Sequence, residues 1–282
     1  MRARMAIRLL ALDLDGTALD AHGALTGSVR AAVAAVRRRG IRVILCTGRR
    51  FRTALPIAEL LHLTGPIVVN NGVLVKEIES GATLQHAYLP RGVYGEVLAL
   101  VRTMGPPLVY VDAYHERRDM LTERIDQAHP FQREYLSENG EFCDVVDDLA
   151  VAAPEEIIML SAMADEATLG DLRARAQAAL GERVKTHALM NKNYRGQILE
   201  FLSPGSGKWP ALARIARAGG IAVEEIACVG DDWNDVEMIR HAGLGIAMGN
   251  AVEPAKQAAA LIVRSNAEGG VVEALERVLL HA

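Results

Sequence analysis

The stretch LLALDLDGTALD, residues 9–20, ends an apolar run with two aspartates, Asp13 and Asp15, that stand two positions apart. In an extended strand, residues two apart point to the same side, so both carboxylates leave the chain together where the apolar run ends. Like charges at this spacing repel each other, and burial adds a further cost to their ionisation. The pair therefore indicates a site that attracts positive charge.

The composition limits the class of protein. The chain has 282 residues, half of them hydrophobic, and a formal net charge of −4. This length fits one large domain or two smaller ones with a sizeable core. The charge gives no reason to expect nucleic acid or a membrane as a partner. We find no signal segment, membrane span or disulfide framework, and therefore expect a cytoplasmic protein.

Short apolar runs alternate with helical patterns in the first and last parts of the chain. In the first part, strands are expected at 6–14, 41–48 and 66–72, and helices at 26–40 and 49–65. The same alternation returns from Lys208, with helices expected at 208–220, 234–242 and 252–259 and strands at 225–230 and 243–249. Such alternation predicts right-handed crossovers and a Rossmann-like α/β core built on a parallel sheet.

The middle of the chain is richer in strands. After a hairpin that turns at 79–81, the patterns predict helices at 91–104 and 165–181 and strands at 107–114, 155–164, 183–190 and 197–202. The intervening residues, 115–148, form a long polar stretch. This α+β character predicts an inserted domain of residues 90–203 between two core segments, residues 1–89 and 204–282.

Four polar clusters follow four of the apolar strands, at residues 13–17, 46–49, 70–72 and 230–235. In an open parallel sheet, ligands bind outside the carboxyl ends of the strands, so we expect all four clusters to meet in one crevice. Several carboxylates tolerate such crowding when a divalent cation lies among them. Mg²⁺ fits best, because it prefers hard oxygen ligands and often binds together with a substrate phosphate.

A carboxylate beside Mg²⁺ and phosphate either holds the metal or attacks phosphorus to form an acyl phosphate. The neighbouring residues favour attack. Thr47 and Asn234 are suited to hydrogen-bond phosphoryl oxygens, and Lys208 is suited to neutralise charge during transfer. Asp15 is suited to protonate the leaving oxygen and then to activate water.

These segments together resemble the haloacid dehalogenase superfamily of aspartyl phosphotransferases. The matching segments are DLDGT at 13–17, CTGR at 46–49, NNG at 70–72, SGKWPAL at 206–212 and GDDWND at 230–235. Residues 236–259 and 266–271 point further, to the Cof-like sugar-phosphatase branch. In that branch a large α/β cap is inserted between the second and third motifs, so the resemblance implies that residues 90–203 form a cap domain.

The resemblance also implies a role for each matching residue. Asp13 would be the nucleophile and Asp15 the general acid and base. The Mg²⁺ ligands would be Asp13, the backbone carbonyl of Asp15, and Asp231. Phosphate contacts are implied for Thr47, Lys208 and Asn234, and a supporting role behind the metal or Lys208 is implied for Asp235.

Other residues in these segments have less certain roles. Gly48, Arg49 and Asn71 are candidate substrate or phosphate ligands, although Arg49 fits a helix-capping role equally well and Asn71 fits the ordering of its turn. Asp232 and Trp233 depart from the small residues that are common in the middle of the last motif. Within the cap, the polar stretches 112–119 and 191–195, with Arg118 and Arg195, are candidates for selecting the leaving group.

The sequence therefore predicts a Mg²⁺-dependent phosphomonoesterase with an aspartyl-phosphate intermediate, acting on a small phosphorylated metabolite, with sugar phosphates favoured. A phosphomutase or phosphotransferase of the same fold is the nearest alternative. A receiver-like regulatory protein or a non-catalytic phosphate-binding protein is less favoured, because of the large insertion and because no motif position is lost. The identity of the substrate and the oligomeric state stay open.

Overall fold

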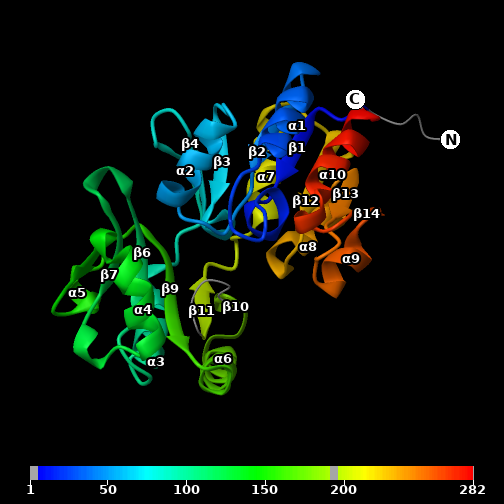
Figure 1. Ribbon diagram of the computed structural model, residues 1–282. Coiled ribbons are helices and arrows are strands. Elements are labelled where there is room, and N and C mark those ends of the chain that lie inside the picture. Colours follow the sequence, from blue (N-terminus) through cyan, green and yellow to red (C-terminus); the bar gives the residue numbers. More distant parts are fainter. Residues whose placement is uncertain (1–5, 191–195, 282) are drawn as a thin grey trace. The chain divides into compact units, whose positions relative to one another are not determined.

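The computed structural model (Figure 1) describes residues 6–190 and 196–281. It divides the chain into two compact units. The first unit consists of residues 1–86 and 207–282, so both ends of the chain contribute to it, and the second consists of residues 87–206. Within the described residues, no helix is both long enough and apolar enough to cross a membrane.

A parallel sheet forms the centre of the first unit. In the described part of this unit it has five strands, in the order β14 (Leu261–Ile262), β13 (Leu244–Ala247), β12 (Ile226–Gly230), β1 (Leu9–Leu12) and β2 (Arg42–Leu45). β1 lies between β12 and β2, with Leu9 opposite Ile226 on one side and Arg42 on the other. All four residues of β1 are buried, as expected for a parallel strand whose two faces are both covered by helices.

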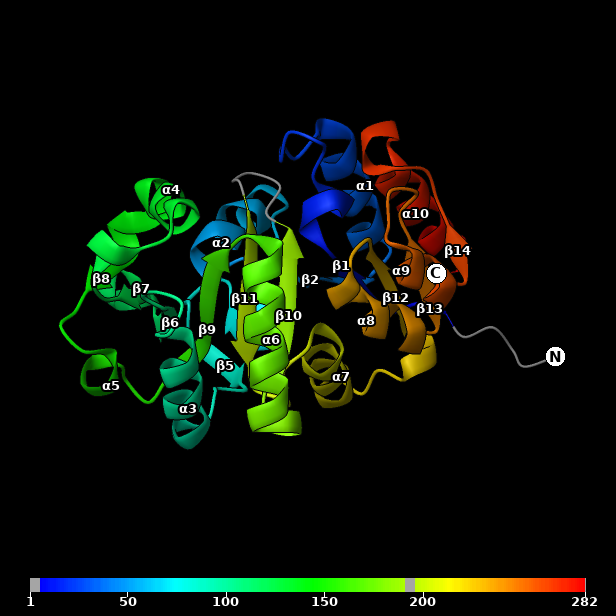
Figure 2. The ribbon, with the colours of Figure 1, turned by 90° about the horizontal axis from the view of Figure 1, so that it is seen from below.

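Helices cover both faces of this sheet (Figure 2). On one face α1 (Gly27–Arg38) packs beside α10 (Gly270–Leu279), and on the other lie α7 (Lys208–Ala218) and α8 (Val236–His241). The core beneath α7 and α8 includes Leu9 and Ile44 from the sheet and Leu212 and Met238 from the helices. Two further helices, α2 (Phe51–Leu60) and α9 (Glu253–Ala258), complete the set of α-helices described for this unit.

The strand expected at 66–72 is shorter than predicted and largely leaves the parallel sheet. β3 (Pro66–Val69) meets the extension of β2 through a parallel bridge between Cys46 and Val68. Otherwise it pairs antiparallel with β4 (Leu74–Glu77), which pairs in turn with β5 (Thr83–His86). Residues 70–72 form a tight turn instead of strand, because all three have positive φ angles.

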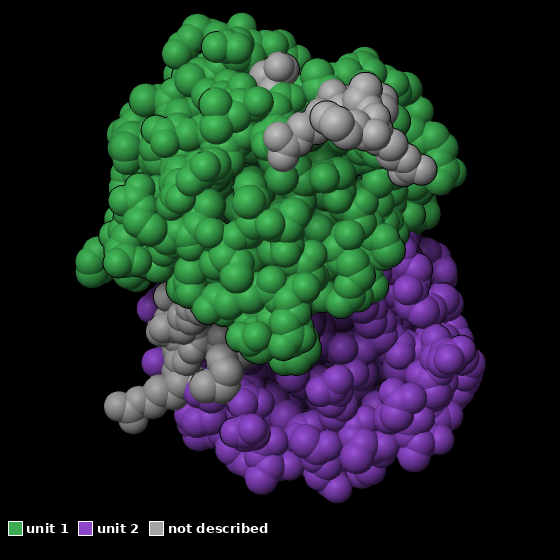
Figure 3. Space-filling view, turned by 90° about the vertical axis from the view of Figure 1, so that its right-hand side faces the viewer, with its two compact units in different colours: residues 1–86, 207–282 green, residues 87–206 purple. Residues whose placement is uncertain are grey.

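The second unit, shown in its own colour in Figure 3, is built on a mostly antiparallel sheet. In its described residues the sheet has the order β10 (Lys185–Met190), β11 (Gln197–Leu202), β9 (Ile157–Ala164), β6 (Leu108–Ala113), β7 (Arg118–Thr122) and β8 (Cys143–Val145). Only the outer pair, β7 and β8, is parallel within this described sheet. The helices α3 (Arg91–Val101) and α6 (Glu166–Leu180) pack on it and share its apolar core.

The stretch 115–148, for which the sequence predicted only a polar character, contains regular elements. Besides β7 and β8 it holds α4 (Pro130–Asn139), and α5 (Leu149–Ala152) follows directly. Only Gln132 and Leu136 of α4 are buried, so the helix has too few apolar positions to show a clear 3.6-residue period. β7 and β8 are short: β7 forms a hairpin with β6, whereas β8 pairs with β7 across the intervening α4.

The central position of β1 leads to a stability prediction. Leu9 is fully buried, whereas Leu60, at the end of α2, is half exposed. We expect Leu9→Ala to lower the free energy of unfolding by about 3 kcal/mol, because it removes buried methyl groups and leaves a cavity. Leu60→Ala should change it by about 0.5 kcal/mol or less. Urea denaturation of both variants tests this, and equal losses would contradict the packing described for β1.

Candidate active site

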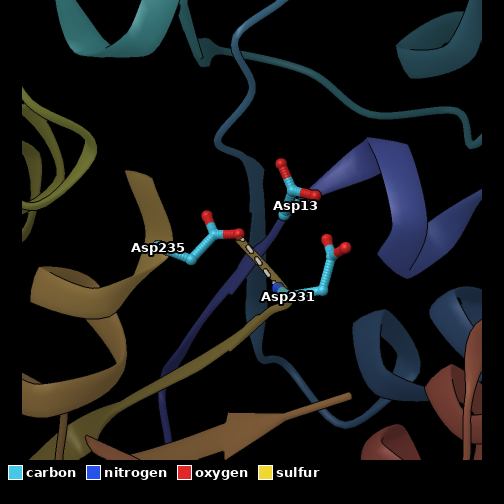
Figure 4. A group of neighbouring side chains, drawn as sticks. All are labelled: Asp13, Asp231 and Asp235. Carbon is cyan, nitrogen blue, oxygen red and sulfur yellow. Dashed lines mark hydrogen bonds between the residues drawn. The ribbon is translucent and has the colours of Figure 1, made fainter. Parts of the chain in front are cut away.

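Three aspartates from the first unit lie together at the carboxyl edge of the parallel sheet. Asp13 follows β1 and Asp231 follows β12, and these strands are neighbours in register, so their ends lie side by side. Asp235 belongs to the short turn before α8. Figure 4 shows the three side chains directed toward one another, and one carboxylate oxygen from each lies within 4.8 Å of the others. All three residues are buried.

Lys208 joins two of these carboxylates. Its Nζ donates to Oδ1 of Asp13 over 2.6 Å and to Oδ1 of Asp235 over 2.7 Å. Lys208 is the first residue of α7 and is only 1% exposed. Burial by itself lowers the pKa of this ammonium, but the charges of Asp13 and Asp235 outweigh burial and raise the pKa above its ordinary value. The ammonium therefore stays charged.

The cluster carries more negative than positive charge. Burial raises the pKa of Asp13 well above its ordinary value; Lys208 opposes this shift, and Asp235 and Asp231 add to it. The single positive charge of Lys208 therefore does not balance the negative charge of three neighbouring carboxylates. Such a donor set, buried and made of oxygen atoms, fits a hard divalent cation.

Asp235 serves mainly to shape the turn that follows β12. Its Oδ2 accepts hydrogen bonds from the backbone N–H groups of Asp231 and Asp232, at 3.0 and 3.1 Å, while Oδ1 receives Lys208. Gly230 lies so close that a Cβ atom there would come within 2.5 Å of Asp235 Cγ. Both oxygens of Asp235 are thus engaged, one by Lys208 and the other by the backbone of its own turn.

Asp231 is held by residues to which the sequence analysis gave no role. Its Oδ1 accepts from the Thr17 hydroxyl at 3.0 Å, and its Oδ2 accepts from Asn250 Nδ2 at 3.3 Å. The same amide donates to the Gly16 carbonyl at 2.8 Å. Asn250 lies just beyond β13, so extending the strand-end argument to this fifth strand would have identified it.

Gly16 explains why the first motif requires glycine. Its φ is +83°, and a Cβ atom there would lie 2.1 Å from Oδ2 of Asp231. Glycine alone therefore allows both the left-handed backbone and the close approach of the Asp231 carboxylate.

Asp15 stands outside the carboxylate cluster and pairs with Arg49. The guanidinium donates from Nη2 to Oδ1 at 2.6 Å and from Nε to Oδ2 at 2.7 Å, a bidentate ion pair. The hydrogen bonds that Arg49 donates to Asp15 raise the pKa of Arg49 against the opposing effect of burial. Neither predicted role of Arg49 anticipated this pair, and the residue that precedes α2 as its cap is Arg50.

The remaining predicted residues of the core segments meet around Asn71. Asn234 donates from Nδ2 to Oδ1 of Asn71 at 2.9 Å. The same oxygen lies 2.9 Å from the point where a Cβ on Gly48 would stand. Thr47, fully buried, accepts at its hydroxyl from the Arg49 N–H at 3.1 Å. The structure thus brings the four predicted strand-end clusters together within the first unit.

Asp232 and Trp233, which depart from the family pattern, lie in the same turn. Oδ1 of Asp232 accepts from the Trp233 N–H at 2.8 Å and so caps the turn. The indole of Trp233 is largely exposed. Asp232 contributes no oxygen to the group formed by Asp13, Asp231 and Asp235.

The two polar stretches proposed for substrate selection belong to the second unit. Arg118, at the start of β7, donates from Nη2 to Glu116 at 2.7 Å, and its Nη1 lies 3.7 Å from a carboxylate oxygen of Asp144. The stretch 191–195, with Arg195, lies outside the described residues.

Comparison with known proteins identifies the family. A family model of haloacid dehalogenase-like hydrolases matches residues 10–275. The chain belongs to the haloacid dehalogenase-like hydrolase family. The resemblance predicted from the motifs is therefore confirmed, and this hydrolase is an enzyme of the family to which those motifs pointed.

Solved structures of similar proteins confirm the fold of this hydrolase. A haloacid dehalogenase-like hydrolase from Bacteroides thetaiotaomicron is 27% identical, with a TM-score of 0.81 over 96% of this chain and 99% of that one. The HAD subclass IIB sugar phosphatase BT4131 has a TM-score of 0.77 at 20% identity, over 96% and 98% of the two chains, which is a likeness of fold. The predicted α/β parallel-sheet core with further sheets is thus confirmed.

Several curated relatives of the hydrolase carry phosphatase names. The putative phosphatase YxeH of Bacillus subtilis (strain 168) is 26% identical over 279 residues, which cover 97% of this chain and 98% of the relative. The 5-amino-6-(5-phospho-D-ribitylamino)uracil phosphatase YitU of the same organism is 28% identical, covering 95% and 96% of the two chains.

The contact between Gly16 and Asp231 gives a testable prediction. We expect Gly16→Ala to displace the Asp231 carboxylate and to weaken binding of a divalent cation about tenfold or more, measured by titration calorimetry. Gly23→Ala is the matched control, because Gly23 has a similar φ of +74° with nothing within 4 Å of the added methyl group. If the two substitutions weaken cation binding equally, strain in the backbone and not the Asp231 contact is responsible.

Proposed function

We propose that this hydrolase is a Mg²⁺-dependent phosphomonoesterase that forms an acyl phosphate on Asp13. One observation carries the proposal: Asp13 is buried at a strand end, 2.6 Å from the ammonium of Lys208 and beside two further carboxylates. A carboxylate placed in this way has a cation to complement an incoming phosphoryl group and little competition from bulk water.

Mg²⁺ would be held by Asp13, the backbone carbonyl of Asp15, and Asp231. When bound, the ion supplies positive charge that offsets the repulsion between Asp13 and an anionic phosphoryl group. The excess negative charge of the cluster supports this assignment, as does the fixed position of Asp231 between Thr17 and Asn250. The carboxylate of Asp235 keeps its hydrogen bonds to Lys208 and to the backbone.

The reaction consists of two displacements at phosphorus. In the first, a carboxylate oxygen of Asp13 attacks phosphorus and the bond from phosphorus to the ester oxygen breaks. Asp15, which carries a proton once its ion pair with Arg49 has opened, gives that proton to the leaving oxygen. In the second, Asp15 takes a proton from water as the water oxygen attacks the same phosphorus. The bond between phosphorus and the Asp13 oxygen breaks, and inorganic phosphate leaves with the carboxylate restored.

Lys208, Thr47 and Asn234 would contact the phosphoryl oxygens during both displacements. Lys208 stays charged, so it can neutralise negative charge on the transferring group. The bidentate pair with Arg49 holds Asp15 in one orientation near the sheet edge. Arg49 thereby acts on Asp15, and its guanidinium meets substrate only when this ion pair opens.

The substrate is proposed to be a small phosphorylated metabolite, with sugar phosphates favoured. Phosphatases named for a phosphorylated ribitylaminouracil and for phosphoglycolate are among the relatives, at 28% identity, and this supports the size class. The second unit would act as the cap that selects the leaving group. Release of inorganic phosphate, as opposed to transfer to a second hydroxyl, separates the phosphatase from the phosphomutase alternative.

The nucleophile can be tested by substitution. Asp13→Asn should lower kcat about a thousandfold or more, because an amide cannot form the acyl phosphate. Asp15→Asn should lower kcat about a hundredfold and allow phosphorylated Asp13 to accumulate, because water is no longer activated. Hydrolysis of an aryl phosphate and mass spectrometry of the quenched protein measure both effects. Near-parental turnover by Asp13→Asn would refute the mechanism.

The metal assignment can be tested with a pair of neighbouring aspartates. Activity should disappear with a chelator and return with Mg²⁺. Asp231→Ala should weaken Mg²⁺ activation tenfold or more, roughly the effect of losing an anionic ligand, whereas Asp232→Ala should leave it nearly unchanged. Similar losses from the two substitutions would show that the ligands are wrongly assigned.

A further inference from the structure

The turn between β3 and β4 has an uncommon backbone. Asn70, Asn71 and Gly72 have φ angles of +50°, +55° and +80°. Asparagine tolerates the left-handed region better than most residues, but a non-glycine residue there is still less stable than glycine. Two asparagines in a row therefore indicate that at least one of the side chains is needed.

The turn lies against two of the segments that form the candidate active site. The N–H of Asn71 donates to the carbonyl of Thr47 at 3.1 Å. A Cβ atom on Gly72 would stand 2.1 Å from the Gly207 carbonyl oxygen and 2.7 Å from the backbone nitrogen of Lys208. The turn is therefore in direct backbone contact with the second motif and with the start of α7.

The side chain of Asn71 reaches a third segment. Its Oδ1 accepts the hydrogen bond from Asn234 Nδ2 at 2.9 Å, between residues 163 positions apart in the sequence. Asn71 is only 6% exposed. The contact fixes the amide plane of Asn234, and with it the direction of the rest of that amide.

We propose that Asn71 is a positioning residue that orients Asn234 for its contact with the phosphoryl group, and is not itself a phosphate ligand. This inference rests on the proposed function and adds a residue whose effect passes through Asn234. It differs from the two roles that the sequence left open for Asn71, since a turn residue alone would need no carboxamide, and the Oδ1 that accepts from Asn234 cannot donate to a phosphate oxygen.

Glycine is the substitution that separates positioning from turn formation. Asn71→Gly keeps or eases the left-handed backbone and removes the carboxamide. We expect it to melt at or above the parental temperature, while kcat/KM for an aryl phosphate falls about tenfold, the loss that corresponds to one ordinary hydrogen bond. Inhibition by inorganic phosphate should weaken in parallel. Asn71→Ala should lose the same activity and also melt lower.

A matched control lies elsewhere in the same unit. His62 follows α2 with a φ of +53° and is exposed. His62→Gly removes the same backbone strain and should leave kcat/KM unchanged. This variant therefore measures the effect of relieving left-handed backbone strain at a position outside the candidate active site.

A double-mutant cycle with Asn234 provides the decisive measurement. If Asn71 acts through Asn234, then Asn71→Gly should cause no further loss of kcat/KM in an Asn234→Ala background. Full additivity of the two losses would overturn the proposal, as would parental kcat/KM in Asn71→Gly. A fall in melting temperature of Asn71→Gly in step with its activity would also overturn it, since the role would then be structural.

These outcomes are separable from failure of the proposed function. Parental kcat/KM in Asn71→Gly together with an inactive Asp13→Asn would remove only the role of Asn71. An active Asp13→Asn would remove the proposed mechanism itself, whatever the Asn71 variants do.

Discussion

The buried ammonium of Lys208 is the interaction on which the site of the first unit depends. It lies within 2.7 Å of carboxylate oxygens on both Asp13 and Asp235. The end of β1, the start of α7 and the turn after β12 thereby meet at one nitrogen atom. Removing either partner of a buried ion pair leaves a charge without compensation, which is strongly destabilising. The arrangement therefore constrains three segments at once.

This single ammonium does not balance the negative charge of the three carboxylates at the site. Asp13 has a raised pKa even with Lys208 beside it, because burial and the carboxylates of Asp235 and Asp231 act against ionisation. Excess buried negative charge destabilises the folded protein by itself and favours the binding of a divalent cation. Local instability of this kind is typical of functional sites, where stability is sacrificed for chemistry.

Glycines at three positions let the segments of the site approach one another closely. Gly16 and Gly230 stand where a side chain would strike Asp231 or Asp235, and Gly72 stands where it would strike the start of α7. Hydrogen bonds then fix the directions of the polar groups that these contacts bring together. The described catalytic candidates all lie in the first unit.

Much of the fold and of the candidate site was predicted from the sequence alone. Alternating apolar runs and helical patterns predict the parallel sheet, and polar residues at the ends of its strands must share one edge, so Asp13 and Asp231 were expected to meet there. Lys208 was added from its charge at the start of a helix and from the family resemblance. Local pattern was weaker in 115–148, where α4 has few apolar positions and the short strand β8 pairs with a strand distant in the sequence.

Only the tertiary structure decided which polar groups pair with which. Arg49 meets Asp15 across 34 positions, Asn71 meets Asn234 across 163, and the amide of Asn250 meets the Gly16 carbonyl across 234. A periodic pattern reports which face of an element is buried, and it carries no information about the partner that a side chain meets after the chain has folded. Side-chain partners depend on distances and angles between segments, and packing of the whole unit sets these.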